Sequence, residues 1–222
     1  MKYLKKYKLF ESVNEQEVHD LCKKYGIRNY TINEDLSIGV EGNVDLRRKG
    51  LTRLPLKFRN VSGDFYCNSN KLTSLEGAPD EVGGSFYFYN NQLTSLEGAP
   101  TSVGGDFYCS NNQLMSLEDA PNGVGNDFWC DNNQLTSLEG LEWKSFNKIF
   151  LNNNPVHEIV KSWINREDRE DLIEYFIDMN VIQEGDNKPK LILPRLEAFH
   201  EDMELEMKIN LEEVKKYYEI VK

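Results

Sequence analysis

The sequence predicts a solenoid: a short curved stack of about six 21-residue coils with a short parallel β-sheet, closed by a helical cap at each end. Three observations predict it. The string LTSLEGAP begins at Leu72 and returns at Leu93, and its variants begin at Leu114 and Leu135, so the copies are evenly spaced along the chain. Apolar residues recur at the same places in each unit, and the flanking segments change to helical periodicity. Repeats of this length are typical of coils that stack on their neighbours.

Counting in steps of one repeat sets the boundaries of the solenoid. One step before Leu72 stands Leu51, which opens LTRLP, and one step after Leu135 stands Val156, which follows NNNP. These first and last units are degenerate, as expected of the units that end a solenoid. The chain therefore divides into an N-terminal cap over 1–41, a solenoid over 42–156 and a C-terminal helical cap over 157–222.

Each coil reads G-G-D-F-Y-C-x-x-N-x-L-x-S-L-E-G-A-P-x-x-V. This pattern resembles the leucine-rich repeat, L-x-L-x-x-N-x-L-x-x-L, with Phe and Cys at the first two leucine positions. Alternation along a short strand predicts that two residues point inward and the one between them points outward. The inward pairs are Phe65 with Cys67, Phe86 with Phe88, Phe107 with Cys109, and Phe128 with Cys130. The resemblance implies a buried Asn that hydrogen-bonds the turning backbone, at Asn70, Asn91, Asn112, Asn133 and Asn154.

After the strand, each coil is predicted to add leucines to the core and then to return along an extended convex side. Leu72 and Leu75, with their equivalents, fill the core beside the strand. Pro79, Pro100 and Pro121 suit an extended chain better than a helix. Paired glycines at 83–84 and 104–105 then turn the chain back into the next strand.

The outward residues of the strands form a candidate binding face. An aromatic stripe of roughly 20 Å follows from strands about 4.8 Å apart. Such a stripe with a polar rim is typical of an interaction surface, and aromatic residues dominate binding hot spots. In the alternative interpretation, the stacked aromatics only support the sheet. The candidate protein-binding residues are Tyr66, Tyr87, Tyr89, Tyr108, Trp129, Phe150, Asp64, Asp106, Asp127 and Asp131.

Charge is concentrated in the coils. Residues 60–143 hold one Lys against twelve Asp and Glu, which accounts for the whole formal net charge of −11. A field of this sign disfavours nucleic acid and favours a protein partner with a basic or amphipathic surface. A second acidic column is either a solvated edge that maintains solubility or a site for a basic partner or a cation; its members are Glu76, Glu97, Glu118 and Glu139.

The two ends carry helical signals. Asn14 and Glu17 form a capping box for a helix that Gly26 ends, and 30–45 reads as strands leading into the solenoid. Four apolar faces at helical spacing follow Val156. They are Val156–Ile164, Leu172–Met179, Leu196–Met203 and Leu211–Val221, with the polar linker QEGDNKPK between the second and third.

The residues predict neither an enzyme nor a cofactor or metal site. The chain shows no legible Ser/His/Asp or Cys/His set and no phosphate-binding loop followed by Lys. His19 and Cys22 lack a second pair of metal ligands. Core packing explains the column of Cys67, Cys109 and Cys130 better than redox chemistry, although a Cys109–Cys130 disulfide is an alternative.

A cytoplasmic location is expected. Charged residues interrupt the basic start MKYLKKYKLFE before an apolar signal core forms, and no apolar run is long enough to span a membrane.

The combination of YTINEDLSI, VDL, LTRLPLKF, the repeated GGDFYC and NNQLTSLEGAP, and NPVHEIV followed by LIEYF resembles leucine-rich-repeat proteins of tailed bacteriophages and other large DNA viruses. The first coil departs from the pattern, with Asp45 and 47–49 in place of polar or aromatic residues. The resemblance implies a viral solenoid, in the host cytoplasm, that binds a host or viral protein, and its most specific form is an inhibitor of a host defence factor. The alternatives are an assembly protein that homo-oligomerises and an enzyme in the helical tail.

Overall fold

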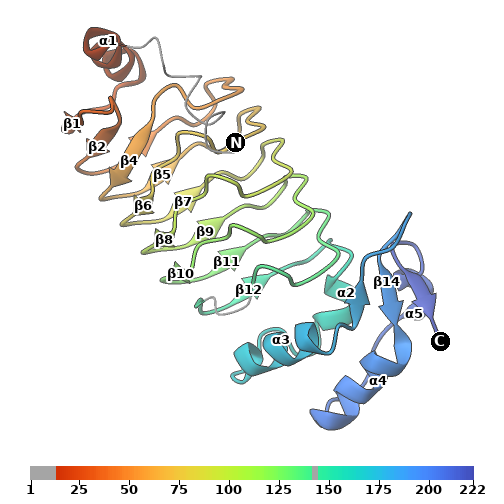
Figure 1. Ribbon diagram of the computed structural model, residues 1–222. Helices are drawn as coiled ribbons and strands as arrows, with labels where there is room; N and C mark the ends of the chain where they lie inside the picture. Colours follow the sequence, from red (N-terminus) through yellow and green to blue (C-terminus); the bar gives the residue numbers. More distant parts are fainter. Residues whose placement is uncertain (1–13, 142–144) are drawn as a thin grey trace.

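The computed structural model describes residues 14–141 and 145–222 and is a parallel-strand β-solenoid of about five turns, with a cap at each end (Figure 1). The first sheet contains the predicted strands, each one repeat after the last, so that Phe65 pairs with Phe86 and Phe107 with Phe128. Its members are β3 (Val44–Asp45), β5 (Phe65–Tyr66), β7 (Phe86–Tyr87), β9 (Phe107–Tyr108), β11 (Phe128–Trp129) and β12 (Ile149–Phe150).

The predicted inward residues form the core of the solenoid. Phe65, Phe86, Phe107 and Phe128 are fully buried, as are the residues two positions later in each strand. The rings of neighbouring coils pack against one another at a steep angle, with centroids 5.5 Å apart for Phe65 and Phe86 and 4.8 Å apart for Phe107 and Phe128. Burial of this continuous apolar column is the main force that holds the coils together.

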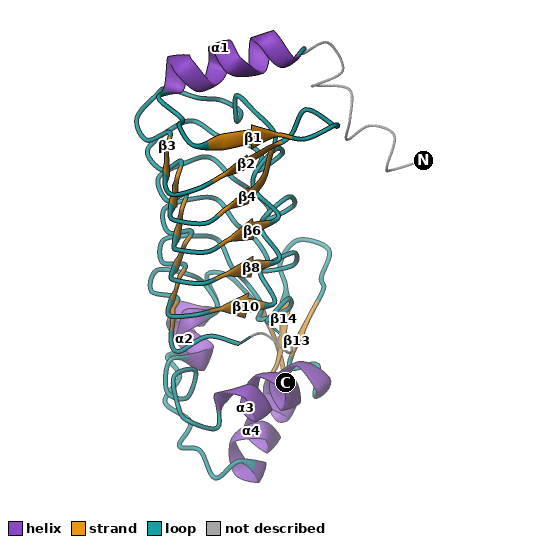
Figure 2. Ribbon diagram, turned by 90° about the vertical axis from the view of Figure 1, so that its left-hand side faces the viewer, coloured by secondary structure: helices purple, strands orange, loops and turns teal. Residues whose placement is uncertain are grey.

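A second parallel sheet lies where an extended convex side is predicted (Figure 2). Its outer strand, β1 (Tyr30–Ile32), pairs antiparallel with β2 (Ile38–Val40). The sequence signal is the apolar residue that recurs once in every coil and points into the core, at Val61, Val82, Val103 and Val124. The parallel members are β2 (Ile38–Val40), β4 (Phe58–Val61), β6 (Glu81–Val82), β8 (Ser102–Val103) and β10 (Gly123–Val124).

A ladder of buried asparagines ties each coil to the one before it. Asn112 is typical: its Oδ1 accepts from the Leu93 N–H at 3.1 Å, and its Nδ2 donates to the carbonyls of Phe88 and Cys109. The residue before each such Asn adopts a left-handed backbone, which Asn tolerates better than most side chains, with φ 55° at Asn111. The expected burial and hydrogen bonding are confirmed for Asn112 and, with the same contacts, for Asn91, Asn133 and Asn154. Asn70, in the first full coil, makes the equivalent hydrogen bonds but is only partly buried.

The N-terminal cap is a helix followed by a hairpin. α1 (Glu15–Tyr25) begins with the predicted capping box of Asn14 and Glu17 and ends at Gly26, whose φ is 71°. Val18 and Cys22 are buried on its inner face. The β1–β2 hairpin then joins the second sheet through the pairing of β2 with β4, so a helix and short strands precede the first coil over 14–41. The basic start over 1–13 lies outside the described residues.

The C-terminal unit is not purely helical, and that prediction is wrong. A polar stretch read as a linker instead joins two strands of a three-stranded sheet, and the fourth predicted helix ends after one turn, before β15. The unit contains α2 (His157–Val160), α3 (Arg169–Asp178), β13 (Ile182–Gln183), β14 (Lys190–Ile192), α4 (Leu193–Asp202), α5 (Leu211–Val214) and β15 (Glu219–Val221).

Three side chains fasten this unit to the last coils. Asn165 accepts from the Ile149 N–H and donates to the Ile149 carbonyl, both at 2.9 Å. Arg169 donates to the carbonyl of Phe146 and covers its ring. The Tyr218 hydroxyl, from a nearly fully buried side chain, donates to the Thr136 carbonyl at 2.7 Å. The unit therefore closes the end of the solenoid, as predicted for a cap.

Candidate functional site

The predicted aromatic stripe is a continuous stack of five rings across the first sheet. Centroids of successive rings lie 4.7 Å apart for Tyr66 and Tyr87, 4.6 Å for Tyr87 and Tyr108, and 5.6 Å for Tyr108 and Trp129. Trp129 and Phe150 are closest, at 3.9 Å, and all four pairs are within 14° of parallel. Each interior ring is covered on both faces by its neighbours, so the stripe offers ring edges and hydroxyl groups to a partner.

The first end of the stripe is already occupied by a cation of the chain itself. The Arg47 guanidinium lies 4.5 Å from the centroid of the Tyr66 ring. It also makes a bidentate pair with Asp45, with Nε–Oδ1 at 3.0 Å and Nη2–Oδ2 at 2.7 Å. Both residues are partly exposed, so the pair positions the guanidinium more than it stabilises the fold. Arg47 is not among the predicted site residues, but it stands one repeat before Asn68 and so belongs to the polar rim.

The acidic rim on one side of the stripe is also a structural ladder. Asn43 Oδ1 accepts from the Asp64 N–H at 2.8 Å, and Asp64 Oδ1 accepts from the Ser85 N–H at 2.8 Å. Ser85 Oγ then accepts from the Asp106 N–H, and Asp106 Oδ1 from the Asp127 N–H. Asn, Asp and Ser all serve in this column, so the ladder requires an acceptor oxygen and not a charge.

The carboxylates act on the phenols beside them. Asp64 accepts a hydrogen bond from the Tyr66 hydroxyl at 2.8 Å, and this bond is the main cause that raises the pKa of Tyr66 to about 12. Burial raises the pKa of Tyr108, and the charges of Asp106 and Asp127 add to the effect. The phenols of Tyr66 and Tyr108 therefore stay neutral well above neutral pH.

The other rim is formed by the residues two positions after the aromatic ones. Asp131 Oδ1 accepts from the backbone N–H of Asn152 at 2.9 Å and from its side-chain Nδ2 at 2.7 Å. Tyr89 is half-buried, and Asn68 is almost fully buried. The indole Nε1 of Trp129 is buried and has no hydrogen-bond partner in the part of the chain that the structure describes. All ten candidate residues therefore form the stripe or its two rims.

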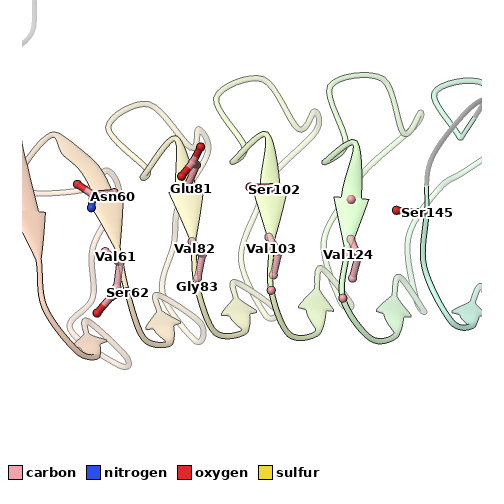
Figure 3. Close-up of a pocket in the computed structure, with 13 residues that line it drawn as sticks. Asn60, Val61, Ser62, Glu81, Val82, Gly83, Ser102, Val103, Val124 and Ser145 are labelled. Carbon is pink, nitrogen blue, oxygen red and sulfur yellow. The ribbon is translucent and has the colours of Figure 1, made fainter.

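The second sheet carries a shallow trough of about 490 Å³ on its outer side (Figure 3). Asn60, Glu81 and Ser102 lie along it, and glycines form much of its floor. A Cβ at Gly104 would overlap the carbonyl oxygen of Gly83, and one at Gly125 would overlap that of Gly104. Close approach of the coils thus explains the small residues, and the trough is a consequence of packing.

Other candidate chemistry does not converge in the structure. Among the described residues, no three His, Cys, Asp or Glu side chains are placed to hold a metal ion, and this includes the column that begins with Glu76. The His19 Nδ1 lies 2.6 Å from the Tyr30 hydroxyl, as suits a surface histidine. All four cysteines are free and fully buried, and burial raises the pKa of Cys67 well above its usual range. Cys109 and Cys130 therefore form no disulfide.

Two further findings bear on identity. None of the helices in the described ranges has the length and apolar character needed to cross a membrane. No family model, curated protein or solved structure matches the chain.

Proposed function

We propose that this protein binds another protein through the outward face of its first sheet, the face formed by the aromatic stripe and its two rims. The observation that carries the proposal is the stack of five part-exposed rings flanked by carboxylates that no Lys or Arg of the described residues neutralises at Asp64, Asp106, Asp127 or Asp131. Solenoids typically use such extended faces for recognition.

The stacking geometry defines the chemistry of the partner. Because neighbouring rings cover the faces of the interior rings, a partner meets apolar ring edges and phenol hydroxyls, while the indole N–H of Trp129 is buried. Its basic groups pair with the carboxylates on either side, at Asp106, Asp127 and Asp131. The partner therefore has a basic, amphipathic surface, and its association rate falls as the salt concentration rises.

The proposed identity of the chain rests on its repeat pattern. We infer a leucine-rich-repeat protein of the kind that tailed bacteriophages and large DNA viruses encode. The buried asparagine column supports this, since it lies where that repeat pattern has its Asn. A viral protein of this kind acts in the host cytoplasm, and inhibition of a host defence factor is the specific form of the proposal. The proposed role is binding and not catalysis.

The test separates the charge of the face from its structural ladder. Asp106→Asn, Asp127→Asn and Asp131→Asn together remove three charges and keep an acceptor oxygen at each ladder position, as Asn43 already provides in the first coil. The control is Glu97→Gln, Glu118→Gln and Glu139→Gln, which removes the same charge from exposed positions away from the stripe.

Both variants and the unaltered protein serve as bait in a lysate of the natural host, and captured proteins are identified by mass spectrometry. We expect a partner that the unaltered protein and the Glu control retain and that the Asp variant loses. Equal capture by all three baits would place recognition elsewhere. A stable homo-oligomer by light scattering, with no captured partner, would favour the assembly role instead.

A further inference from the structure

The proposed binding face carries charges of opposite sign in different coils. In the first coil, the residues that begin the turn after β3 are basic and exposed: Arg47, Arg48 and Lys49. The equivalent positions of the later coils hold no Lys or Arg, only Asn, Ser, Tyr and Asp: 68–70, 89–91, 110–112, 131–133 and 152–154. The basic triplet therefore marks the first coil alone.

The backbone of this turn is the same in the first coil as in the later ones. Arg48 has φ 54°, and its counterparts have the same left-handed backbone, with φ 57° at Ser69 and 55° at Asn90. The N–H of Arg48 donates to the Asn68 carbonyl at 3.3 Å, which ties the turn to the second coil. Asn adopts this backbone more readily than Arg, and residues held in it often lie at ligand-binding sites. The first coil thus has a cation at a position where its backbone favours Asn.

Two of the three cations have no counter-ion in the described part of the chain. Arg47 pairs with Asp45 at 2.7 Å and lies over the Tyr66 ring. Arg48 and Lys49, in contrast, make no ion pair with any residue over 14–141 or 145–222. An anionic group of a partner can therefore pair with them at the first end of the stripe.

The acidic part of the face lies three and four coils further on. Asp106 precedes β9, and Asp127 and Asp131 flank β11; none of them makes an ion pair with a described residue. Since neighbouring strands are about 4.8 Å apart, β9 and β11 lie about 14–19 Å from β3. The column of Asp106 and Asp127 continues in the next coil with the exposed Lys148. The region that attracts cations is therefore centred on these two coils.

We propose that the partner segment on this face is bipolar and binds in one orientation along the stack. Its acidic group pairs with Arg48 and Lys49, and its basic groups pair with Asp106, Asp127 and Asp131. An extended chain rises about 3.3 Å per residue, so the two charged parts of the segment are about four to six residues apart. The proposal rests on the proposed function, since it specifies the partner of the same face. The reversed orientation places like charges together and is disfavoured.

The orientation is measured with two synthetic peptides as probes. One has glutamates at its N-terminus, lysines at its C-terminus and a short neutral segment with a tyrosine between them, and the other has the reverse order. Each peptide carries a nitroxide label at its acidic or its basic end, and NMR at low salt records which amide signals of the protein broaden. For both peptides, we expect the acidic-end label to broaden 45–49 most and the basic-end label to broaden 127–131 most. Broadening that is uniform, reversed, dependent on chain direction or absent would overturn the proposal.

A pair of variants tests the role of the two free cations. Arg48→Asn with Lys49→Gln removes both and gives the turn an Asn where several later coils have one. The control, Arg53→Gln with Arg59→Gln, removes the same charge from exposed positions of the first coil that lie outside the first sheet. Affinities for the peptides come from NMR titration.

The loss of two exposed ion pairs should weaken binding of the bipolar peptides to the Arg48 and Lys49 variant by about threefold to tenfold. A peptide with glutamine in place of glutamate should bind this variant at least as tightly as the unaltered protein, because a repulsion is removed. The control variant should leave both affinities unchanged. Equal losses for both kinds of peptide would show that the two cations do not recognise the acidic group, which contradicts the proposal.

Failure of this proposal is distinguishable from failure of the proposed function. If the Arg48 and Lys49 variant binds the bipolar peptides normally while the Asp106, Asp127 and Asp131 variant still loses its captured partner, the fixed orientation is wrong and the binding face stands. If capture ignores the same Asp variant, the partner binds elsewhere and both proposals fail.

Discussion

Replacing Tyr108 by Ala tests whether the stripe supports the fold as well as binding. The Tyr108 ring is stacked on Tyr87 at 4.6 Å and 12° and on Trp129 at 5.6 Å and 14°. Each aromatic pair contributes about 0.5–1.5 kcal/mol beyond its buried area, so the loss of two pairs lowers the free energy of unfolding by about 1–3 kcal/mol. At about 2–4 °C per kcal/mol for a chain of this size, Tm falls by about 2–12 °C.

Tyr108→Phe is the matched control, because it keeps both stacked pairs and removes only the hydroxyl. Its Tm should stay within about 2 °C of that of the unaltered protein, since the hydroxyl is at the edge of a part-exposed ring. The assay is equilibrium denaturation together with the affinity for the captured partner. An Ala variant as stable as the unaltered protein would refute the supporting role of the stack. In binding, the Ala variant should lose about 2 kcal/mol or more, over tenfold in affinity.

Three further outcomes are expected. The fragment 1–156 should be insoluble or fail to unfold cooperatively, because it lacks the side chains of Asn165 and Tyr218 that close the last coils; a soluble, cooperative fragment would contradict this. Ultraviolet titration should place the pKa of Tyr66 near 12, and this pKa should fall toward 10 in the Asp64→Ala variant. Because the pKa of Tyr66 is higher in the folded than in the unfolded protein, the stabilisation from its hydrogen bond to Asp64 is present below pH 10 and is lost as the pH rises toward 12. Thiol labelling of the native protein should be slow at every cysteine and fast after denaturation, and rapid native modification of any one would show that it is accessible: Cys22, Cys67, Cys109 and Cys130.

The solenoid is predictable from sequence because its signals repeat. A residue pattern displaced by one repeat fixes strand register, so the inward Phe65 and outward Tyr66 follow from counting alone. The capping box at Asn14 is equally legible, since it requires only one local pattern. The stripe follows in the same way, because side chains alternate between the two faces of a strand.

The rest depends on contacts that single positions do not show. In the sequence, the second sheet is marked only by the recurring Val82 and its equivalents. An extended segment that pairs with no neighbour would show the same recurring valine. Asp106 is both a charged residue of the rim and a hydrogen-bond acceptor for the next coil. The second role is visible only in the structure, where its Oδ1 accepts from the Asp127 N–H. In the C-terminal unit, strands of two or three residues are too short for periodicity, so Val221 was assigned to a helix although it belongs to β15.

Asn165 has a consequence beyond fastening the C-terminal unit. Parallel strands in register at about 4.8 Å are also the arrangement of amyloid fibrils, and the last strand of such a stack is a template for a strand of another molecule. The Asn165 amide takes the place of that strand's peptide group, since it both accepts from and donates to the backbone of Ile149. One side chain thus helps to keep a repeating structure finite.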